Sequence, residues 1–188
     1  MKLILASTSP RRIELLKRLN IPFEVHPPQF DESSSEKLSP EAEAILFARA
    51  KALSLKARFP EATIIGSDTL VVLSQKKLGK PETPEAAKAM LRQLSGQTHR
   101  VLTAVAVWHG PSGRLSEFLQ EAKVTFKTTS EKEIEDYVAT GEPLDKAGAY
   151  AIQGIGAQFI AAVEGDVGTV VGLPVKQLNK LLLSLPLK

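Results

Sequence analysis

A single carboxylate interrupts a segment that otherwise has the character of a buried strand. Asp68 lies between the apolar residues Ile64 and Ile65 on one side and 70–73 on the other. Burying an ionised carboxylate is costly unless a metal, another cation or a proton compensates it. His and Cys do not cluster nearby, so the plausible compensators are a hard cation and lysines such as Lys51 and Lys80. This combination indicates chemistry on phosphate.

Hydroxyl groups and arginines gather near the start of the chain, in the sequence Ser7-Thr8-Ser9-Pro10-Arg11-Arg12. The segment lies between a predicted strand and a predicted helix N-terminus, where hydroxyls and backbone N–H groups can bind an anion. The two arginines add fixed charge and forked donors. A capped helix with solvent-facing arginines explains the spacing about equally well.

Two adjacent acids, Asp31 and Glu32, lie in a segment rich in Pro, Ser and acidic residues. A hydrated acidic loop is the favoured interpretation of this pair taken alone. If the loop returns to Asp68, two carboxylates could hold Mg²⁺ or Mn²⁺, because hard cations prefer oxygen ligands.

The dipeptide Gly79-Lys80 superficially resembles part of a phosphate-binding P-loop. The P-loop pattern requires a glycine where this chain has Ser74 and a Ser or Thr where it has Pro81, so a Walker-type ATPase is excluded. Lys51 lies on a predicted helix, where a solvated charge is the more common role. The three histidines, 26, 99 and 109, are widely separated and are expected to be structural.

Composition limits the class of protein. The 188 residues are 43% hydrophobic and 24% charged, which is typical of a globular chain with a real core. Cysteine is absent, which excludes disulfides, thiolate metal sites and cysteine nucleophiles. The net charge of +3 is dispersed and aromatic residues are only 5%, so a small anionic ligand fits better than a nucleic acid polymer. No signal peptide or membrane span is recognisable, and a cytoplasmic location is the expectation.

The elements that must position these residues alternate between strands and helices, with the same Ser/Thr-Pro device at three helix starts. Strands are predicted at 3–6, 22–25, 63–73, 98–108, 115–128 and 158–163, and helices from Pro10 to about 19, from Pro40 to about 59, at 84–94, from 131 to before Gly141, and from Pro174 to about 185. Residues 75–77 are expected to form a polar turn, and 98–128 a long hairpin that favours a sheet with an antiparallel portion. We therefore predict one α/β domain spanning 1–188.

Several motifs in order over nearly the whole chain resemble those of the Maf-type nucleoside triphosphate pyrophosphatases. They are Leu5-Ala6-Ser7-Thr8-Ser9-Pro10-Arg11-Arg12, Gly66-Ser67-Asp68-Thr69, Gly79-Lys80-Pro81, Ser95-Gly96-Gln97-Thr98-His99, the segment 141–154 (GEPLDKAGAYAIQG) and Val171-Gly172-Leu173-Pro174. The resemblance implies an elongated mixed β-sheet flanked by helices, with two lobes around a central cleft, as in the inosine triphosphate pyrophosphatase architecture. It also implies a possible homodimer.

The reaction implied by the resemblance is hydrolysis of a nucleoside triphosphate between the α and β phosphates with a divalent cation, Mg²⁺ or Mn²⁺. By position, Asp68 resembles the catalytic base and a metal ligand, Glu32 a metal-associated carboxylate, and Lys51 and Lys80 catalytic or phosphate-binding lysines. Residues that would help to hold the triphosphate or its base are Ser7, Arg11 and Arg12.

Substrate choice follows from three residue types. Arg11, Thr69 and Gln153 together resemble the branch of the family that acts on dTTP and UTP, whereas the branch that acts on 7-methyl-GTP carries an acid in place of Gln153. A neutral amide both donates and accepts, which suits the carbonyl and imide N–H of uracil or thymine. The segment 164–169 departs from its relatives, which makes fine specificity harder to predict than reaction type.

Two alternative functions are also compatible with the sequence. One is a regulatory interaction protein, since the family is associated with inhibition of septum formation. The other is a purine-directed pyrophosphatase on the same fold. The presence of Asp68, Lys80 and Glu32 favours the enzyme, because a pure binding module has no need of them.

Overall fold

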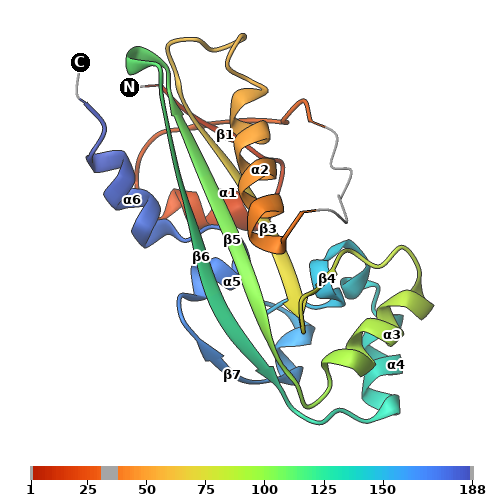
Figure 1. Cartoon of the computed structure of the whole chain (residues 1–188). Helices are drawn as coiled ribbons and strands as arrows, with labels where there is room; N and C mark the ends of the chain where they lie inside the picture. Colours follow the sequence, from red (N-terminus) through yellow and green to blue (C-terminus); the bar gives the residue numbers. More distant parts are fainter. Residues whose placement is uncertain (1, 31–37, 187–188) are drawn as a thin grey trace. The chain divides into compact units, whose positions relative to one another are not determined.

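A mixed β-sheet organises the chain in a computed structural model that describes residues 2–30 and 38–186 (Figure 1). Within these residues seven strands form the sheet, with the order β2-β1-β3-β5-β6-β7 and with β4 paired to β3. The strands are β1 (Leu3–Ala6), β2 (Glu24–His26), β3 (Thr63–Leu73), β4 (Lys76–Leu78), β5 (Thr98–His109), β6 (Arg114–Phe126) and β7 (Ile160–Glu164). β1 runs parallel to β2 and β3, whereas β4 and β7 are antiparallel to their partners. The predicted mixed α/β fold is confirmed.

Helix starts follow the Ser/Thr-Pro and capping-box signals of the sequence. The helices are α1 (Pro10–Lys17), α2 (Pro40–Leu53), α3 (Pro84–Leu94), α4 (Glu131–Ala139), α5 (Val167–Val171) and α6 (Val175–Leu183). The side chains of Ser39 and Thr83 accept hydrogen bonds from the third residue after them, and Ser130 forms a complete capping box with Glu133. Ser9 occupies the N-cap position of α1, but its side chain makes no cap hydrogen bond.

Two details of the sequence prediction were wrong. α2 ends at Leu53 rather than near 59, because the Ser54 hydroxyl donates to the Lys51 carbonyl and accepts from the backbone N–H of Gln29. Residues 76–78 form strand β4 instead of a turn. The turn lies one residue earlier, at Ser74 and Gln75, which both have positive φ.

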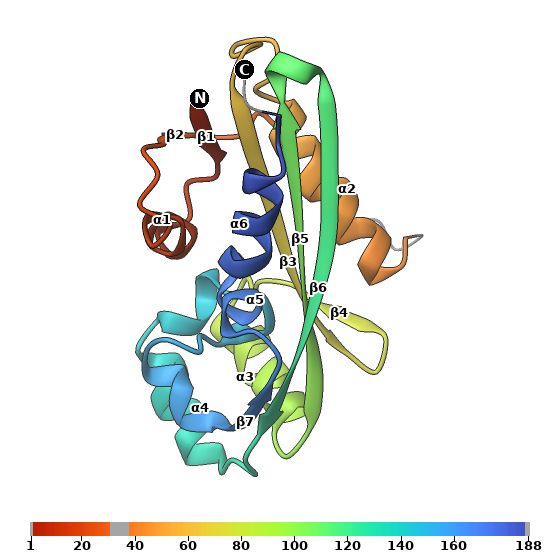
Figure 2. The ribbon, with the colours of Figure 1, turned by 90° about the vertical axis from the view of Figure 1, so that its left-hand side faces the viewer.

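The chain divides into two compact units, and each has its own core. Unit 1 takes the described residues of 1–68, 103–120 and 172–188. Its β1 and the first half of β3 are fully buried, and α2 lies on the opposite side of the strands from α1 and α6 (Figure 2). The alanines Ala44, Ala48 and Ala52 are fully buried on α2, next to the buried Phe47 and Lys51.

Unit 2 takes residues 69–102 and 121–171. Helices α3 and α4 pack together, and the core joins Leu91 and Ile134 to an aromatic group. In that group Phe126 contacts His99, Tyr150 and Phe159 at ring-centroid distances of 5.2, 4.8 and 6.0 Å. The single-domain assignment and the cleft between lobes stay predictions.

Candidate active site

Asp68 and Lys51 form a buried ion pair in unit 1. Lys51 Nζ donates to Asp68 Oδ1 at 2.6 Å, and the two side chains are only 4% and 8% exposed. A lone charge in such a position would carry a large desolvation cost, so each residue supplies the compensation that the other needs. Lys51, one of the two lysines expected to compensate Asp68, is therefore in direct contact with it.

Gly66 explains why the two residues meet. It lies two positions before Asp68, and residues with that spacing in a strand share a face. A Cβ at Gly66 would be 2.2 Å from the Ala48 carbonyl oxygen and 2.6 Å from the Ala52 nitrogen. Only glycine lets the backbone of α2 pack so closely on β3 at this point. Lys51, between these two alanines in sequence, is thereby brought to the carboxylate.

The second carboxylate oxygen of Asp68 is poised for a ligand. Among residues 2–30 and 38–186, Asp68 Oδ2 is buried and has no hydrogen-bond partner. Buried polar atoms normally have one, so an orphan in this position points to a group that binds there. Either a proton donor or a hard cation satisfies a carboxylate oxygen.

Asp68 Oδ2 is suited to bind a divalent cation, and the described residues supply few other protein ligands for it. The described part of the chain has no group of three or more His, Cys, Asp or Glu side chains that could hold a metal. The other expected ligand, Glu32, lies outside the described residues. Mg²⁺ is commonly held by one or two carboxylates together with substrate phosphates, so the donor set is compatible with a cation that arrives with a phosphate.

One carbonyl joins three of the sequence motifs. Gly172 O accepts from Arg12 Nε at 3.0 Å and from Ser67 Oγ at 3.0 Å. The Ser67 hydroxyl also lies 3.0 Å from the Ala104 carbonyl oxygen. Gly172 has a φ of 118°, a conformation that favours glycine. Arg12 and the residue before Asp68 are thus fixed to the same point of unit 1.

Ser7 follows the buried strand β1 and shapes the turn into α1. Its side chain is buried, and its Oγ accepts from the backbone N–H of Ser9 at 3.2 Å. This short side chain-to-backbone bond stabilises the turn. Arg11, on the first turn of α1, is half-buried. In unit 1, the side chains of four predicted site residues thus make hydrogen bonds: Ser7, Arg12, Lys51 and Asp68.

The remaining predicted residues belong to unit 2. Lys80 is exposed and Thr69 half-buried, and Gln153 is exposed in the loop before the short 3₁₀ helix Ile155–Phe159. Gly79, next to Lys80, accepts at its carbonyl from the backbone N–H of Gly148 at 3.0 Å. The motif of Lys80 is thus fixed to the segment that leads to Gln153.

The sequence did not predict a role for Glu142. Its carboxylate accepts from the backbone N–H groups of Ile155 at 3.1 Å and Gly156 at 2.9 Å. A carboxylate 13 residues before a glycine-rich turn is the only signal in the sequence, and it is a weak one.

His99 has the structural role that the sequence favoured. It is 1% exposed, and its Nε2 lies 2.7 Å from the Tyr150 hydroxyl. Burial lowers the pKa of His99 to about 4, so the ring is neutral near pH 7. Burial also raises the pKa of Tyr150 well above its ordinary value.

Comparison with known proteins decides the family. A family model described as Maf-like protein matches residues 2–185. The chain belongs to the Maf-like protein family. A dTTP/UTP pyrophosphatase of Moorella thermoacetica is 51% identical over 181 residues, which cover 96% of this chain and 93% of that protein. Proteins with the same name from a Geobacillus species and Pyrococcus horikoshii are 49% and 45% identical, each over 94% of this chain and over 94% and 92% of their own lengths.

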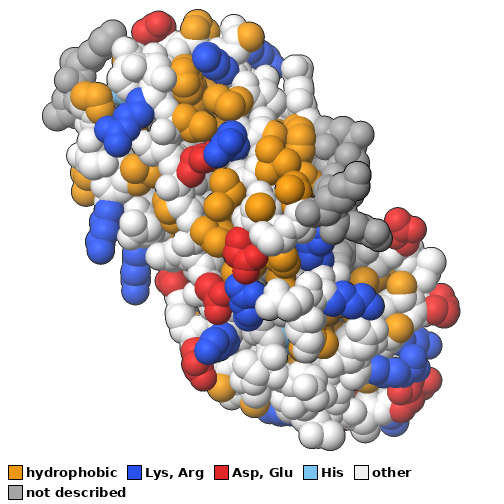
Figure 3. Space-filling view, viewed as in Figure 1, with side chains coloured by type: hydrophobic (Ala, Val, Ile, Leu, Met, Phe, Trp, Pro, Cys, Tyr) orange, Lys and Arg blue, Asp and Glu red, His pale blue; other side chains and the backbone are white. Residues whose placement is uncertain are grey.

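The fold has a solved counterpart outside these Maf-like relatives. The Ham1 protein of Staphylococcus aureus matches 97% of this chain and 98% of its own with a TM-score of 0.54 and 17% identity. At that identity the likeness concerns the fold alone. Among the described residues we find no helix with the length and apolar character needed to cross a membrane. Lys and Arg side chains in Figure 3 are interspersed with Asp and Glu rather than gathered into one stripe.

Proposed function

We propose that this protein hydrolyses dTTP and UTP between the α and β phosphates, releasing pyrophosphate and the nucleoside monophosphate. The observation that carries the proposal is the 45–51% identity, over nearly full length, to relatives named dTTP/UTP pyrophosphatase. The buried Asp68–Lys51 pair supports it, because it gives this chain a fixed carboxylate with one oxygen unengaged among the described residues.

The carboxylate of Asp68 is suited to the role of general base. Lys51 binds Oδ1, which orients the group, while Oδ2 is left to take a proton from the attacking water. The water oxygen forms a bond to phosphorus, the bond to the bridging oxygen breaks, and pyrophosphate leaves with that electron pair. No covalent enzyme intermediate is needed.

A divalent cation completes the proposed chemistry, with Asp68 and Glu32 as its protein ligands. When bound, Mg²⁺ or Mn²⁺ supplies charge neutralisation on the phosphates and polarisation of the scissile group. Arg12, held through Nε by Gly172, together with Ser7, Arg11 and Lys80, is proposed to bind the phosphates or the base. Thr69 and Gln153 are proposed to read the pyrimidine edge.

The test is an assay of product identity as well as rate. Purified protein is incubated with dTTP, UTP, CTP, ATP, GTP and 7-methyl-GTP, with Mg²⁺, with Mn²⁺ and with a chelator, and the products are separated by anion exchange. We expect UMP and pyrophosphate from UTP, and the corresponding pair from dTTP, only when a cation is present. Release of UDP and phosphate would refute the cleavage site, and a purine preference would remove Gln153 from base selection. Absence of turnover for every nucleotide would refute the proposal as a whole and favour the interaction protein.

Two further expectations from the sequence, a homodimer and a cytoplasmic location, stay predictions. Light scattering of the purified protein and fractionation of cells that produce it test them separately from activity.

A further inference from the structure

The loop that carries Gln153 is bound on its C-terminal side by one carboxylate. Glu142 is the first residue of the 3₁₀ helix Glu142–Asp145, which follows α4 in unit 2. Its Oε1 accepts from the backbone N–H of Ile155 and its Oε2 from that of Gly156. These are the first two N–H groups of the helix Ile155–Phe159, and N–H groups at a helix start have no partner within the helix. Both oxygens of one side chain are therefore used to fix a backbone turn.

Gly154 shows how tightly the carboxylate fits. Its φ is 133° and its ψ is −159°, a region that is open essentially to glycine alone. A Cβ at this position would lie 2.1 Å from Glu142 Oε1 and 3.0 Å from Glu142 Cδ. The absence of a side chain at Gly154 is thus what lets the carboxylate reach the two N–H groups.

Glu142 is itself held in place from several directions. Its backbone N–H donates to Thr140 Oγ1 at 3.2 Å, and its carbonyl accepts from Lys146 Nζ at 3.1 Å. Burial alone would raise the pKa of Glu142, but the Tyr137 hydroxyl, the two N–H groups and Lys146 outweigh burial and lower it. The Tyr137 hydroxyl has no hydrogen bond of ordinary geometry within the described residues. We therefore attribute its lowering of the Glu142 pKa to its position close to the carboxylate. The carboxylate is therefore ionised in neutral solution.

A second anchor lies just before Gln153. Tyr150 is 5% exposed and its hydroxyl is bonded to His99, and Ala151 is 3% exposed. Gln153 is thus an exposed residue between a buried anchor on one side and the Glu142 carboxylate on the other. A backbone held on both sides fixes the position and Cα–Cβ direction of Gln153, so less backbone entropy is lost when its side chain binds a ligand.

We propose that Glu142 is a positioning residue that fixes the turn at 153–156 and thereby sets the orientation of Gln153 for base recognition. The role of Glu142 in base recognition rests on the proposed function, whereas its role in fixing the turn is independent of that function. Glu142 does not contact the reacting atoms in this scheme. It acts only through the backbone that bears Gln153.

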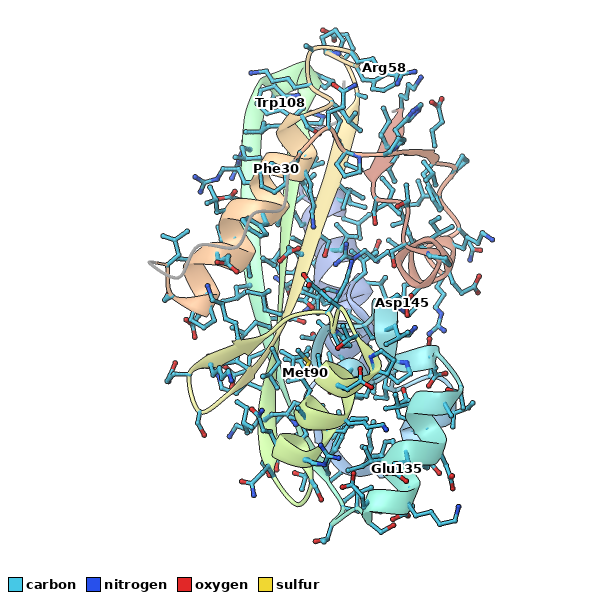
Figure 4. All side chains as sticks on the ribbon, turned by 90° about the vertical axis from the view of Figure 1, so that its right-hand side faces the viewer. Phe30, Arg58, Met90, Trp108, Glu135 and Asp145 are labelled. Atoms are coloured by element: carbon cyan, nitrogen blue, oxygen red, sulfur yellow. The ribbon has the colours of Figure 1, made fainter. Side chains whose placement is uncertain are left out.

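The experiment compares Glu142→Gln with a matched control, Glu135→Gln. Glu135 is an exposed carboxylate on α4, in the same unit, so the two variants lose the same charge (Figure 4). The first measurement is hydrogen exchange at the amides of Ile155 and Gly156. In Glu142→Gln these amides exchange at least about tenfold faster, because a lost bond worth about 1.4 kcal/mol changes the opening equilibrium tenfold. Buried β5 amides are unchanged in both variants.

The second measurement is the ratio of kcat/KM for UTP to that for CTP. Glu142→Gln lowers this ratio about tenfold, mainly by raising KM for UTP, while kcat stays within about threefold. A merely structural defect would instead lower the amount of active enzyme and reduce kcat for both nucleotides equally. The Glu135→Gln variant keeps both the exchange rates and the ratio.

A Gly154→Ala variant removes the same contact by another route, because its Cβ displaces the carboxylate, and it also strains the backbone at the φ of 133°. If both changes act through one contact, the double variant Glu142→Gln/Gly154→Ala loses discrimination no further than the single variants do. Losses that multiply would contradict a shared contact.

The outcomes separate this inference from the proposed function. Unchanged exchange at Ile155 and Gly156 in Glu142→Gln overturns the inference whatever the enzyme does. Faster exchange with an unchanged UTP-to-CTP ratio also overturns it, because the turn then has no bearing on recognition. If the unmodified protein hydrolyses no nucleotide, the proposed function fails, and the exchange rates alone decide whether Glu142 fixes the turn.

Discussion

Acid destabilisation of unit 2 should depend on one buried histidine. His99 is 1% exposed, and burial lowers its pKa from 6.5 to about 4. Between these two values the unfolded chain binds more protons than the folded chain, so the free energy of unfolding falls as the pH falls. The contribution of the neutral His99 to the free energy of unfolding is fully present above about pH 6.5 and is lost progressively toward pH 4.

The expected size follows from the two pKa values. The folded and unfolded pKa values of His99 differ by about 2.5, which corresponds to a loss of about 3 kcal/mol in the free energy of unfolding once the pH is below both values. Between pH 7.5 and 5, the loss is about 2 kcal/mol, since the unfolded histidine is then largely protonated and the folded one is not. The Tyr150 hydroxyl, the hydrogen-bond partner of His99, stays neutral throughout this range because burial raises its pKa.

Urea unfolding followed by far-ultraviolet circular dichroism at pH 7.5, 6.5 and 5 measures this effect. Carboxylates also begin to titrate in this range, so the informative quantity is the difference between the unmodified protein and His99→Gln. Direct NMR titration of the His99 ring gives its pKa. A His99 pKa near 6.5, or a His99→Gln variant with the same pH dependence as the unmodified protein, would refute the reasoning.

Three further predictions concern stability. Lys51→Met should destabilise unit 1 by about 3–5 kcal/mol in urea unfolding, because it removes the cationic partner of the buried Asp68 side chain. Lys51→Met/Asp68→Asn should recover part of this loss, and a double variant no more stable than Lys51→Met would count against this reason. Gly66→Ala should lower the free energy of unfolding by at least about 1–3 kcal/mol in the same assay, whereas Gly79→Ala, whose Cβ would meet nothing within 4 Å, should lower it less. Equal losses in the two variants would argue against close packing at Gly66. Ser130→Ala should lower the thermal midpoint through a loss of about 1 kcal/mol, because the capping box disappears, and an unchanged midpoint would contradict that role.

Local signals in the sequence predicted most of the elements. Proline after Ser or Thr placed the starts of α1, α2 and α3, and the capping box placed that of α4. These signals depend on residues within one helical turn, so no knowledge of the tertiary structure is needed. The carboxylate in an apolar strand likewise indicated that Asp68 requires compensation.

The features that could not be predicted depend on distant contacts or on an unusual backbone. The sequence does not predict strand β4, because the turn before it uses Ser74 and Gln75 with positive φ, where Asn or Gly is the usual signal. Which lysine meets Asp68 depends on the packing of α2 on β3 at Gly66. The contact of Glu142 with Gly156 joins residues 14 apart through a backbone N–H group, for which the sequence gives only a weak signal.

If Asp68 is the general base of the hydrolysis, its replacement should abolish most of the turnover. Pyrophosphate release from UTP is measured for the unmodified protein, for Asp68→Asn and for Asp136→Asn, which changes an exposed aspartate on α4. We predict that Asp68→Asn lowers kcat by at least about a hundredfold, as expected for loss of a general base, while circular dichroism shows a folded protein and Asp136→Asn keeps its rate. A folded Asp68→Asn variant with a near-normal kcat would contradict the account.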